Sequence, residues 1–343
     1  MTKKTALITG ISGQDGAYLA EFLLKKKYRI IGIERRSARS NNWRLEKLNI
    51  KNKVTIVDLD IKEVNNLIRL FDKYKIDEVY NLAAQSFVHS SFQNPIETSL
   101  VNSIGVLNLL EIIRNKKNKI KFYQASTSEM FGESRKNSQN EKTLFHPRSP
   151  YATSKIFAHF SVQNYREAYK LHAVNGILFN HESPLRGEEF ITRKITLGLS
   201  KIIFNKQKEL KIGNLYAKRD WGYAKDYVEA MWLMLQKDKP DDYVIATGET
   251  NSVRDFAQVA AKSIDIDIEW DSEGDSEIGI CKKTGSTIIS IDKQYTRPSE
   301  TDHLLGDASK AKENLGWKPS INFQSLVIMM VEHDLKRIED NNF

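Results

Sequence analysis

The chain has only one cysteine, Cys281, in 343 residues. A disulfide within the chain is therefore excluded, and a reducing cytoplasm is the natural compartment. Long hydrophobic runs are also missing. No apolar stretch approaches the roughly 18 residues that span a bilayer, and the apolar run at the N-terminus is too short for a signal peptide. We therefore expect a cytoplasmic protein with no membrane partner.

The sequence has no concentrated block of one charge. Net charge is +8, since 52 Lys and Arg residues outnumber 44 Asp and Glu residues, but the two signs are interleaved along the chain. Basic stripes interleaved with aromatic residues, which are typical of nucleic-acid binding, are absent. We expect no nucleic-acid partner and no bound metal ion.

Regular alternation of short apolar strands with helical patterns dominates the first half. Strands are predicted at 5–9, 28–33, 54–57, 78–82 and 173–178, with another ending before Ser126, and one helix is predicted at 102–114. Such alternation predicts an α/β fold with a Rossmann-type, doubly wound parallel sheet.

Beyond Glu182 the pattern is less regular. We predict a helix at 190–205, a short strand at 211–214, a helix opened by Arg219 that runs to Gln236, a strand at 242–246 and a polar loop at 271–287. The expected organisation is a Rossmann domain, residues 1–181 plus about 219–248, and a smaller, discontinuous C-terminal substrate-binding domain, residues 182–218 and 249–343.

Three glycines follow the first strand and open a helix, at Gly10, Gly13 and Gly16. Glycine permits a tight turn and lets the backbone approach a pyrophosphate, and the helix N-terminus supplies N–H donors. Between a strand and a helix this spacing indicates a dinucleotide site.

The residues after the second strand bear on which dinucleotide binds. An acid there holds the ribose 2′-hydroxyl of NAD, whereas arginine accommodates the 2′-phosphate of NADP. The chain has Glu34 followed by Arg35 and Arg36. A pair of guanidinium groups suits a dianionic phosphate, so we predict NADP, with Glu34 as the counter-argument. Asp58, after the third strand, is predicted to meet the adenine amino group, or alternatively to cap a helix.

A second group of reactive side chains lies between Gln124 and Lys155. Tyr151 and Lys155 are four residues apart at the start of a predicted helix and share one face. A lysine ammonium near the phenol lowers its pKa and lets tyrosine act as a base. Thr127 and Glu129 follow a predicted strand nearby. Tyr-x-x-x-Lys alone is also compatible with an ordinary amphipathic helix, but its setting favours a redox site with an additional acid/base.

These motifs together resemble the extended short-chain dehydrogenase/reductases that act on nucleotide sugars, and within them the GDP-mannose 4,6-dehydratase family. The resemblance covers nearly the whole chain. It is carried by Gly10-x-x-Gly13-x-x-Gly16, Asn81-Leu-Ala-Ala, Ser126-Thr-Ser-Glu-Met-Phe-Gly, Phe179-Asn-His-Glu-Ser-Pro184, Thr192-Arg-Lys-Ile-Thr196, Arg219-Asp-Trp-Gly222 and Arg297-Pro-x-Glu300.

The resemblance implies a lyase that makes a GDP-4-keto-6-deoxy sugar from a GDP-manno-sugar. Tyr151, helped by Lys155, takes the proton of the sugar 4-hydroxyl, which Thr127 holds, while C4 gives hydride to NADP. Glu129 then removes the C5 proton and assists loss of the 6-hydroxyl as water. The hydride returns to C6, so tightly bound NADP is regenerated in each turnover.

The resemblance also implies binding residues. Those expected at the cofactor are Gly10, Ser12, Gly13, Gln14, Asp15, Gly16, Arg35, Arg36, Asp58, Leu59, Leu82, Ala83, Ala84, Ser86, Tyr151, Lys155, His181 and Arg186. Those expected at the GDP-linked sugar are Ser86, Thr127, Ser128, Glu129, Asn180, Lys194, Arg219, Arg297 and Glu300. For each arginine, a surface ion pair is the alternative. A homo-tetramer or homodimer is implied as well.

Two positions depart from the family's pattern. Glu97 stands where the family usually has an aromatic residue near the nicotinamide, and Leu185 stands where it usually has the first of two arginines. Either departure is compatible with a modified sugar, and GDP-D-glycero-D-manno-heptose would react by the same mechanism. A nucleotide-sugar epimerase or reductase is the second enzymatic alternative, and an NADP-binding regulatory protein is the non-enzymatic one. Glu129 favours elimination over both.

Overall fold

In the computed structural model, seven parallel strands form one sheet in the order β11-β6-β5-β4-β1-β2-β3. The structure describes residues 3–38, 40–117, 119–133, 138–296, 298–301 and 303–340. The strands are β1 (Thr5–Thr9), β2 (Arg29–Glu34), β3 (Thr55–Asp58), β4 (Glu78–Asn81), β5 (Lys121–Thr127), β6 (Ala173–Leu178) and β11 (Tyr243–Ile245). The predicted α/β class with a doubly wound parallel sheet is therefore confirmed.

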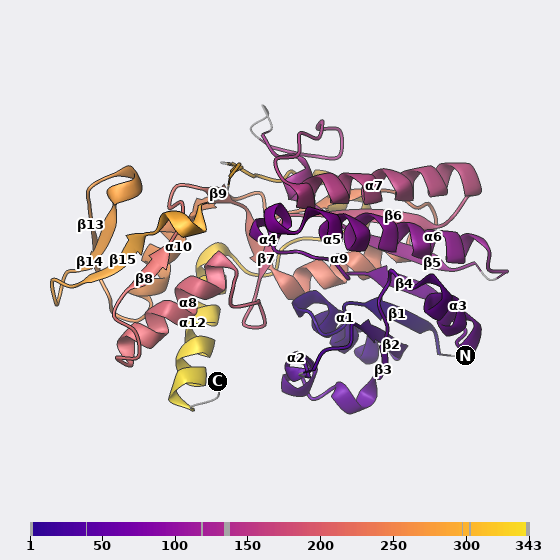
Figure 1. Ribbon diagram of the computed structural model, residues 1–343, viewed down its shortest axis with the longest axis horizontal. Helices are drawn as coiled ribbons and strands as arrows, with labels where there is room; N and C mark the ends of the chain where they lie inside the picture. Colours follow the sequence, from indigo (N-terminus) through magenta and orange to yellow (C-terminus); the bar gives the residue numbers. More distant parts are fainter. Residues whose placement is uncertain are drawn as a thin grey trace.

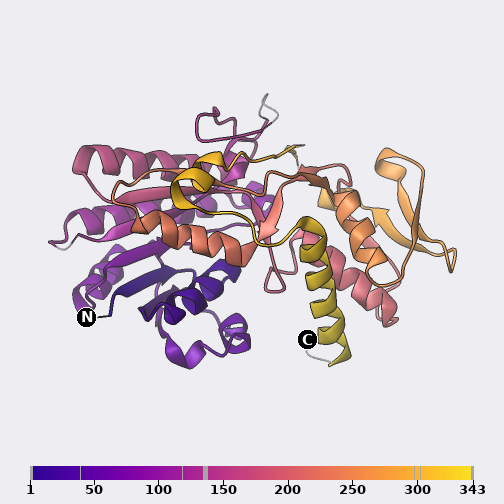
Figure 2. The same ribbon diagram turned by 180° about the vertical axis from the view of Figure 1, so that it is seen from behind.

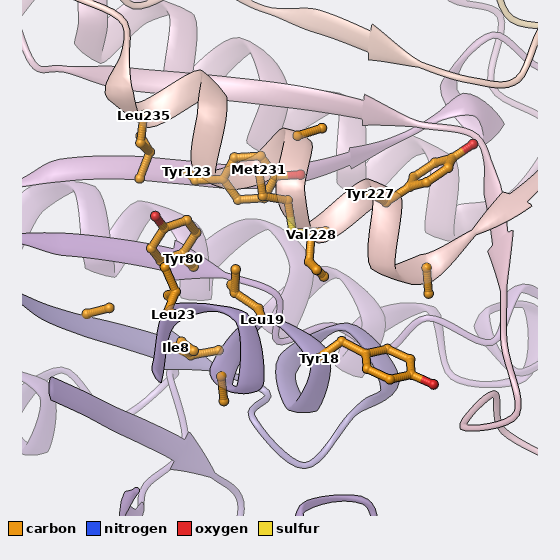
Figure 3. Close-up of a cluster of buried hydrophobic side chains, with 14 of the residues drawn as sticks. Ile8, Tyr18, Leu19, Leu23, Tyr80, Tyr123, Tyr227, Val228, Met231 and Leu235 are labelled. Atoms are coloured by element: carbon orange, nitrogen blue, oxygen red, sulfur yellow. The ribbon is translucent and has the colours of Figure 1, made fainter. Parts of the chain in front are cut away.

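Helices cover both faces of this sheet. The helices that belong to it are α1 (Gln14–Lys25), α2 (Trp43–Lys47), α3 (Val64–Lys73), α4 (Val88–Gln93), α5 (Pro95–Ser99), α6 (Gly105–Arg114), α7 (Pro150–Tyr169), α9 (Ala224–Gln236) and α11 (Ser309–Leu315). Because neighbouring residues of a strand point to opposite faces, Ile8 packs with α1 and α9 in one core (Figure 3), and Leu7 packs with α3, α6 and α7 in the other.

A second group of elements, built around a smaller sheet, lies to one side of the seven-stranded sheet and its helices (Figures 1 and 2). A four-stranded sheet consists of β13 (Ile268–Asp271), β14 (Ile278–Cys281), β15 (Thr287–Ile291) and β8 (Leu210–Ile212), and packs with α8 (Ile191–Ile203), α10 (Val253–Lys262) and α12 (Phe323–Glu339). Two short pairs, β10 (Trp221–Tyr223) with β7 (Asn180–Glu182) and β12 (Asn251–Ser252) with β9 (Lys218–Arg219), complete the described strands.

Three local predictions were wrong. The stretch from Arg219 to Tyr223 forms β9 and β10, and the helix begins only at Ala224. The stretch 271–287, predicted as a polar loop, contains β14. This strand pairs with β13 on one side and β15 on the other, and the three form an antiparallel meander. The helix predicted from residue 102 begins at Pro95, whose fixed φ suits a first helical position, and passes through a π-helical turn at Leu100–Ile104 into α6.

Contrary to the expectation that no apolar stretch is long enough, that continuous helix, Pro95–Arg114, is long and apolar enough to cross a membrane by length and composition, the one such run within the described residues. Half of its apolar window is buried inside the protein, and its α6 part packs in the core with α3 and α7. A core helix passes the same test, so the finding is weak evidence for a membrane span.

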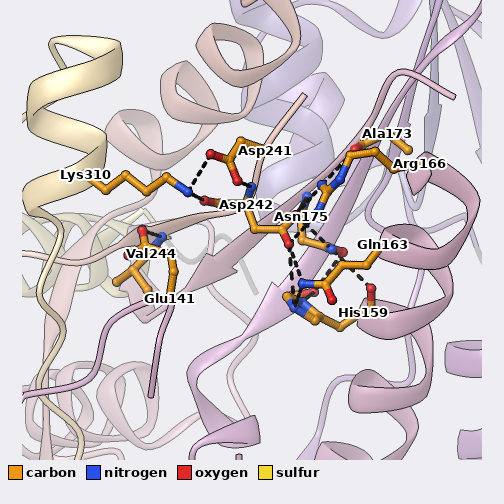
Figure 4. Close-up of polar contacts among 11 residues, drawn as sticks. Glu141, His159, Gln163, Arg166, Ala173, Asn175, Asp241, Asp242, Val244 and Lys310 are labelled. Atoms are coloured by element: carbon orange, nitrogen blue, oxygen red, sulfur yellow. Dashed lines mark hydrogen bonds and ion pairs between the residues drawn. The ribbon is translucent and has the colours of Figure 1, made fainter. Parts of the chain in front are cut away.

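A buried polar network fixes α7 to the sheet (Figure 4). Arg166 donates two hydrogen bonds to Asp242, at 2.7 and 2.9 Å. Gln163 Nε2 donates to His159 Nε2 at 3.1 Å, which leaves the proton on Nδ1, 3.1 Å from Ser126 Oγ. The His159 ring is therefore neutral, with Nε2 as the acceptor and Nδ1 as the donor. It lies one turn after Lys155 on the same helix.

Acid should destabilise the fold through His159. Burial lowers the pKa of His159 to about 4 from its ordinary 6.5, against the opposing charge of Asp242. Between these two pH values the unfolded chain binds the proton and the folded protein does not, so stability falls as pH falls through this window. We expect this group to lower the free energy of unfolding by about 2–3 kcal/mol between the two pH values. His159→Gln should remove that pH-dependent loss. Urea unfolding at about pH 7 and about pH 4.5 measures it.

The control for that experiment is His89→Gln on α4. This variant makes the same substitution outside the network of His159, Gln163 and Asp242. An equal acid loss in His159→Gln and in the unaltered protein would contradict the assignment.

Candidate active site

The strand order reverses beside β1, so the turns after β1 and β4 lie next to each other at the carboxyl end of the sheet, where ligands of such folds bind. Gly10 has φ +69°, in the left-handed region, and a Cβ there would lie 3.0 Å from Ala83 N. At Gly16 a Cβ would lie 2.3 Å from Gly10 O. Only glycine fits at both positions, so the turn can be this tight.

The same turn fits a dinucleotide pyrophosphate. Gly13 is the extended N-cap of the 12-residue α1, and no side chain caps the helix there. The first N–H groups of a helix have no intrahelical acceptor and lie at its positive end, where an anion is favourable. Gly10, Gly13 and Gly16 thus form a tight turn between β1 and α1, with Ser12 inside it, which we call the cradle, and Leu82 and Ala83 lie against it after β4.

The side chains of Gln14 and Asp15 contact β7. Gln14 Nε2 donates to His181 O at 3.1 Å, and Asp15 Oδ2 lies 2.7 Å from His181 Nε2. His181 Nδ1 lies 2.7 Å from Phe179 O, an acceptor, so both ring nitrogens carry protons when Asp15 is ionised. Burial works against the charged ring, but Asp15 outweighs it and raises the pKa of His181. Together these three residues connect the cradle to β7.

At the ends of β2 and β3, acids and bases lie together. Glu34 and Asp58 are register partners on adjacent strands, and burial followed by the charge of Asp58 raises the pKa of Glu34. Arg35 Nη1 lies 3.5 Å from Glu97 Oε1 on α5. Arg36 and Asp58 are exposed, and Leu59 is buried. Glu97 therefore lies beside Arg35, at the end of β2.

The predicted catalytic residues come together at the end of β5. Thr127 ends β5 and accepts a hydrogen bond from Glu129 N at 3.2 Å, which closes a 3₁₀ turn over Ser128–Met130. Ser149 caps α7 and Pro150 follows it, so α7 starts one residue before Tyr151. Thr127, Glu129 and Tyr151 are each 8% exposed, so all three hydroxyl and carboxyl groups lie in a largely buried site.

Lys155 is on the same face of α7 as Tyr151, but its ammonium does not reach the phenol. Nζ lies 5.8 Å from the Tyr151 ring centroid and donates to Ala125 O at 2.8 Å. Burial raises the pKa of Tyr151 to about 12, although a hydrogen bond from Thr127 lowers it, and burial lowers the pKa of Lys155 to about 8. The predicted depression of the tyrosine pKa is therefore wrong, because burial of the phenol outweighs the hydrogen bond from Thr127.

A buried chain of hydrogen bonds, absent from the predictions, links the cradle to Lys155. Thr9 Oγ1 donates to Asn81 Oδ1 at 2.6 Å, and Asn81 Nδ2 donates to Gln124 Oε1 at 2.8 Å. Gln124 Nε2 then donates to Ala125 O at 3.1 Å, the carbonyl that also accepts from Lys155. These are register partners on β1, β4 and β5, so only the strand order could reveal the chain.

The expected substrate residues lie on the elements that join the two sheets. Arg219 on β9 donates to Glu300 Oε1 at 2.9 Å. Lys194 on α8 lies 3.0 Å from the Tyr295 ring centroid, and burial lowers the pKa of this lysine to about 8. Asn180 Oδ1 on β7 is buried and makes no hydrogen bond within the described residues. Ser86 is exposed and Ser128 is buried; Arg297 is outside the described residues.

The loop after β7 is held by arginines that the predictions did not assign. Arg193 is fully buried, pairs with Asp334 at 2.6 Å and donates to the carbonyls of Pro184 and Arg186. Arg44 donates to Leu185 O at 2.7 Å and to Ser12 O at 3.1 Å. Arg186 itself lies 3.1 Å from Glu182 Oε2 and over the Phe190 ring.

Among the described residues no group of three or more His, Cys, Asp or Glu side chains is arranged to hold a metal ion.

Solved structures share the architecture. The UDP-glucose 4-epimerase of Thermotoga maritima, solved with UDP-glucose, has a TM-score of 0.81 at 23% identity, with 97% of this chain and 99% of that chain covered. The dTDP-glucose 4,6-dehydratase of Bacillus anthracis, solved with NAD, also has a TM-score of 0.81, at 20% identity and 98% coverage of both chains.

Sequence relatives are closer. GDP-mannose 4,6 dehydratase of Homo sapiens is 48% identical over 347 residues, covering 99% of this chain and 93% of the relative. GDP-mannose 4,6 dehydratase 1 of Arabidopsis thaliana is 50% identical over 344 residues, covering 97% and 90%. The family model described as GDP-mannose 4,6 dehydratase matches residues 7–330. The chain belongs to the GDP-mannose 4,6-dehydratase family.

Proposed function

We propose that the chain is an NADP-dependent hydro-lyase that converts GDP-mannose to GDP-4-keto-6-deoxymannose. The observation that carries the proposal is the buried carboxylate of Glu129 beside Thr127 and Tyr151 at the carboxyl end of β5. Elimination of water needs an acid/base in addition to the Tyr–Lys pair, and family membership agrees with it.

Oxidation at C4 starts with a proton transfer. Tyr151 takes the proton of the sugar 4-hydroxyl, which Thr127 orients. Bound NADP supplies a cationic nicotinamide that accepts hydride from C4 and later returns it to C6. Burial raises the pKa of Tyr151, and the hydrogen bond from Thr127 and the charge of Arg186 oppose that rise.

Elimination follows from the new 4-ketone, which acidifies the proton on C5. Glu129 removes that proton, and the C5–C6 double bond forms as the C6–O bond breaks. The protonated Glu129 gives its proton to the departing hydroxyl, which leaves as water. One carboxyl group therefore acts first as base and then as acid, and its burial excludes competing solvent. When C6 regains hydride, C5 takes up the proton that Tyr151 removed from the 4-hydroxyl, so Tyr151 is again a base for the next turnover.

NADP is proposed from Arg35 and Arg36 after β2, with the adenine near Asp58 and Leu59. The pyrophosphate would lie on the cradle of Gly10, Ser12, Gly13 and Gly16 at the start of α1. Asp15, Gln14 and His181 would act behind that cradle, and Ala83, Ala84 and Ser86 would face the nicotinamide half together with Arg186.

The GDP diphosphate and ribose are proposed to bind Asn180, Lys194, Arg219, Arg297 and Glu300. Within the described part of the chain Asn180 Oδ1 is buried without a hydrogen-bond partner, as expected of an acceptor that meets a ribose hydroxyl. We propose the division into an NADP-binding domain, residues 1–181 plus about 219–248, and a GDP-sugar-binding domain, residues 182–218 and 249–343.

Neither of the two departures from the family pattern, Leu185 and Glu97, favours a larger sugar as substrate. Leu185 is 2% exposed and packs in the core beneath α1 and α9. Glu97 pairs with Arg35 and Lys62, on the cofactor side. GDP-mannose is therefore our proposed substrate, and GDP-manno-heptose is tested beside it.

The test is to incubate the purified protein separately with the two GDP-sugars, with no added reductant, and to follow the mass of the sugar nucleotide. We expect GDP-mannose to lose the mass of one water without net consumption of NADP. Unchanged mass with both sugars, in a protein that binds NADP, would refute the dehydratase. Loss of water from the heptose only would change the substrate and keep the reaction.

We also propose a cytoplasmic homodimer or homo-tetramer. Ile96, Leu100 and Ile104 recur every fourth residue along one helical run and are 76%, 40% and 41% exposed, and Phe157 and Phe160 on the neighbouring α7 are also exposed. Exposed apolar faces of this kind mark interfaces. Ile104→Arg should reduce the sedimentation coefficient to that of a smaller species, whereas Ile203→Arg, on α8, should not. Equal behaviour of the two variants would contradict this interface.

A further inference from the structure

Glu97 links three elements around the ends of β2 and β3. Both of its carboxylate oxygens accept from Lys62 Nζ, at 2.7 and 2.9 Å, and Arg35 Nη1 lies 3.5 Å from Oε1. Lys62 follows β3, Arg35 follows β2, and Glu97 is on α5. Arg35, which follows β2, is thus already paired with a carboxylate of the same chain.

Carboxylates are numerous at this end of the sheet. Glu34 and Asp58 end adjacent strands, and Asp60 Oδ2 lies 3.6 Å from Lys62 Nζ. At the same end of the sheet, Glu97 pairs with Arg35 and Lys62, and Asp60 pairs with Lys62. A dianionic 2′-phosphate is therefore attracted less strongly than two consecutive arginines alone would suggest, because repulsion between like charges opposes it.

We propose that Glu97 is a specificity-determining residue for the nucleotide, and that it weakens the preference for NADP over NAD. This inference rests on the proposed function. Its carboxylate competes with the 2′-phosphate for Arg35, because a guanidinium that binds phosphate with two parallel N–H groups cannot keep its pairing with α5. NAD lacks that phosphate and leaves the Glu97–Arg35 pair intact, while Glu34 remains available to a ribose 2′-hydroxyl.

The test compares the dissociation constants of NADP and NAD for the full-length protein, with no sugar present, by calorimetry. Glu97→Gln should tighten NADP binding about threefold and leave NAD binding unchanged, since an exposed ion pair is worth up to a few-fold in affinity. The effect should shrink at about 0.5 M salt. Glu313→Gln on α11 makes the same change of charge far from this site and should alter neither constant.

Arg35→Gln completes a double-mutant cycle. With Arg35 absent, Glu97→Gln should lose most of its effect on NADP, because the two residues act on the same phosphate. The inference would be overturned if Glu97→Gln left the ratio of the NADP and NAD dissociation constants unchanged, or if it weakened NADP binding. Either result would leave the proposal that the protein binds NADP intact. If neither nucleotide binds the unaltered protein, the proposed function fails, and this inference fails with it.

Discussion

Replacing Glu129 by glutamine should reduce the loss of water from GDP-mannose by about a thousandfold or more, within the range of general acid–base catalysis. Glutamine has nearly the same shape but can neither take the C5 proton nor give one to the departing hydroxyl. The turn that holds it should persist, because Thr127 bonds to the backbone N–H of residue 129 and not to its side chain.

The same variant should still carry out the first step. Tyr151 and Thr127 are unchanged, so oxidation at C4 can proceed and reduced nicotinamide should accumulate to a stoichiometric level that near-ultraviolet absorbance detects. Glu133→Gln is the matched control, since it removes an exposed carboxylate on the same segment, and it should keep full activity. Undiminished dehydration in Glu129→Gln would exclude this residue as the acid/base.

Tyr151→Phe should abolish the reaction at its first step, with a loss of about a thousandfold or more. The phenol oxygen is the only part removed, and the buried ring still fills its place on α7. Because C4 is not oxidised, reduced nicotinamide should not accumulate. Rapid-mixing absorbance therefore distinguishes this variant from Glu129→Gln, in which the loss comes after oxidation.

Tyr169→Phe, at the exposed end of α7, is the matched control for the loss of a phenol and should remain active. NADP should still bind Tyr151→Phe, since the glycine cradle is built from β1 and α1. Accumulation of reduced nicotinamide in Tyr151→Phe would show that another group removes the 4-hydroxyl proton.

The sequence by itself determined the parts of this protein that depend on neighbouring residues. Strand–helix alternation predicts the seven parallel strands, because a strand and the helix that follows it are local. The spacing of Gly10, Gly13 and Gly16 predicts the cradle, since one turn contains all three. Tyr151 and Lys155 share a face because they are one helical turn apart.

Tertiary structure decided what depends on pairing between distant segments. β9 and β10 are two and three residues long, too short for periodicity, and exist because β12 and β7 supply their hydrogen bonds. Arg193 is buried only because Asp334 reaches it from α12. The position of Glu97 beside Arg35 follows from the packing of α5 against the ends of β2 and β3, and no local pattern specifies which charges meet there.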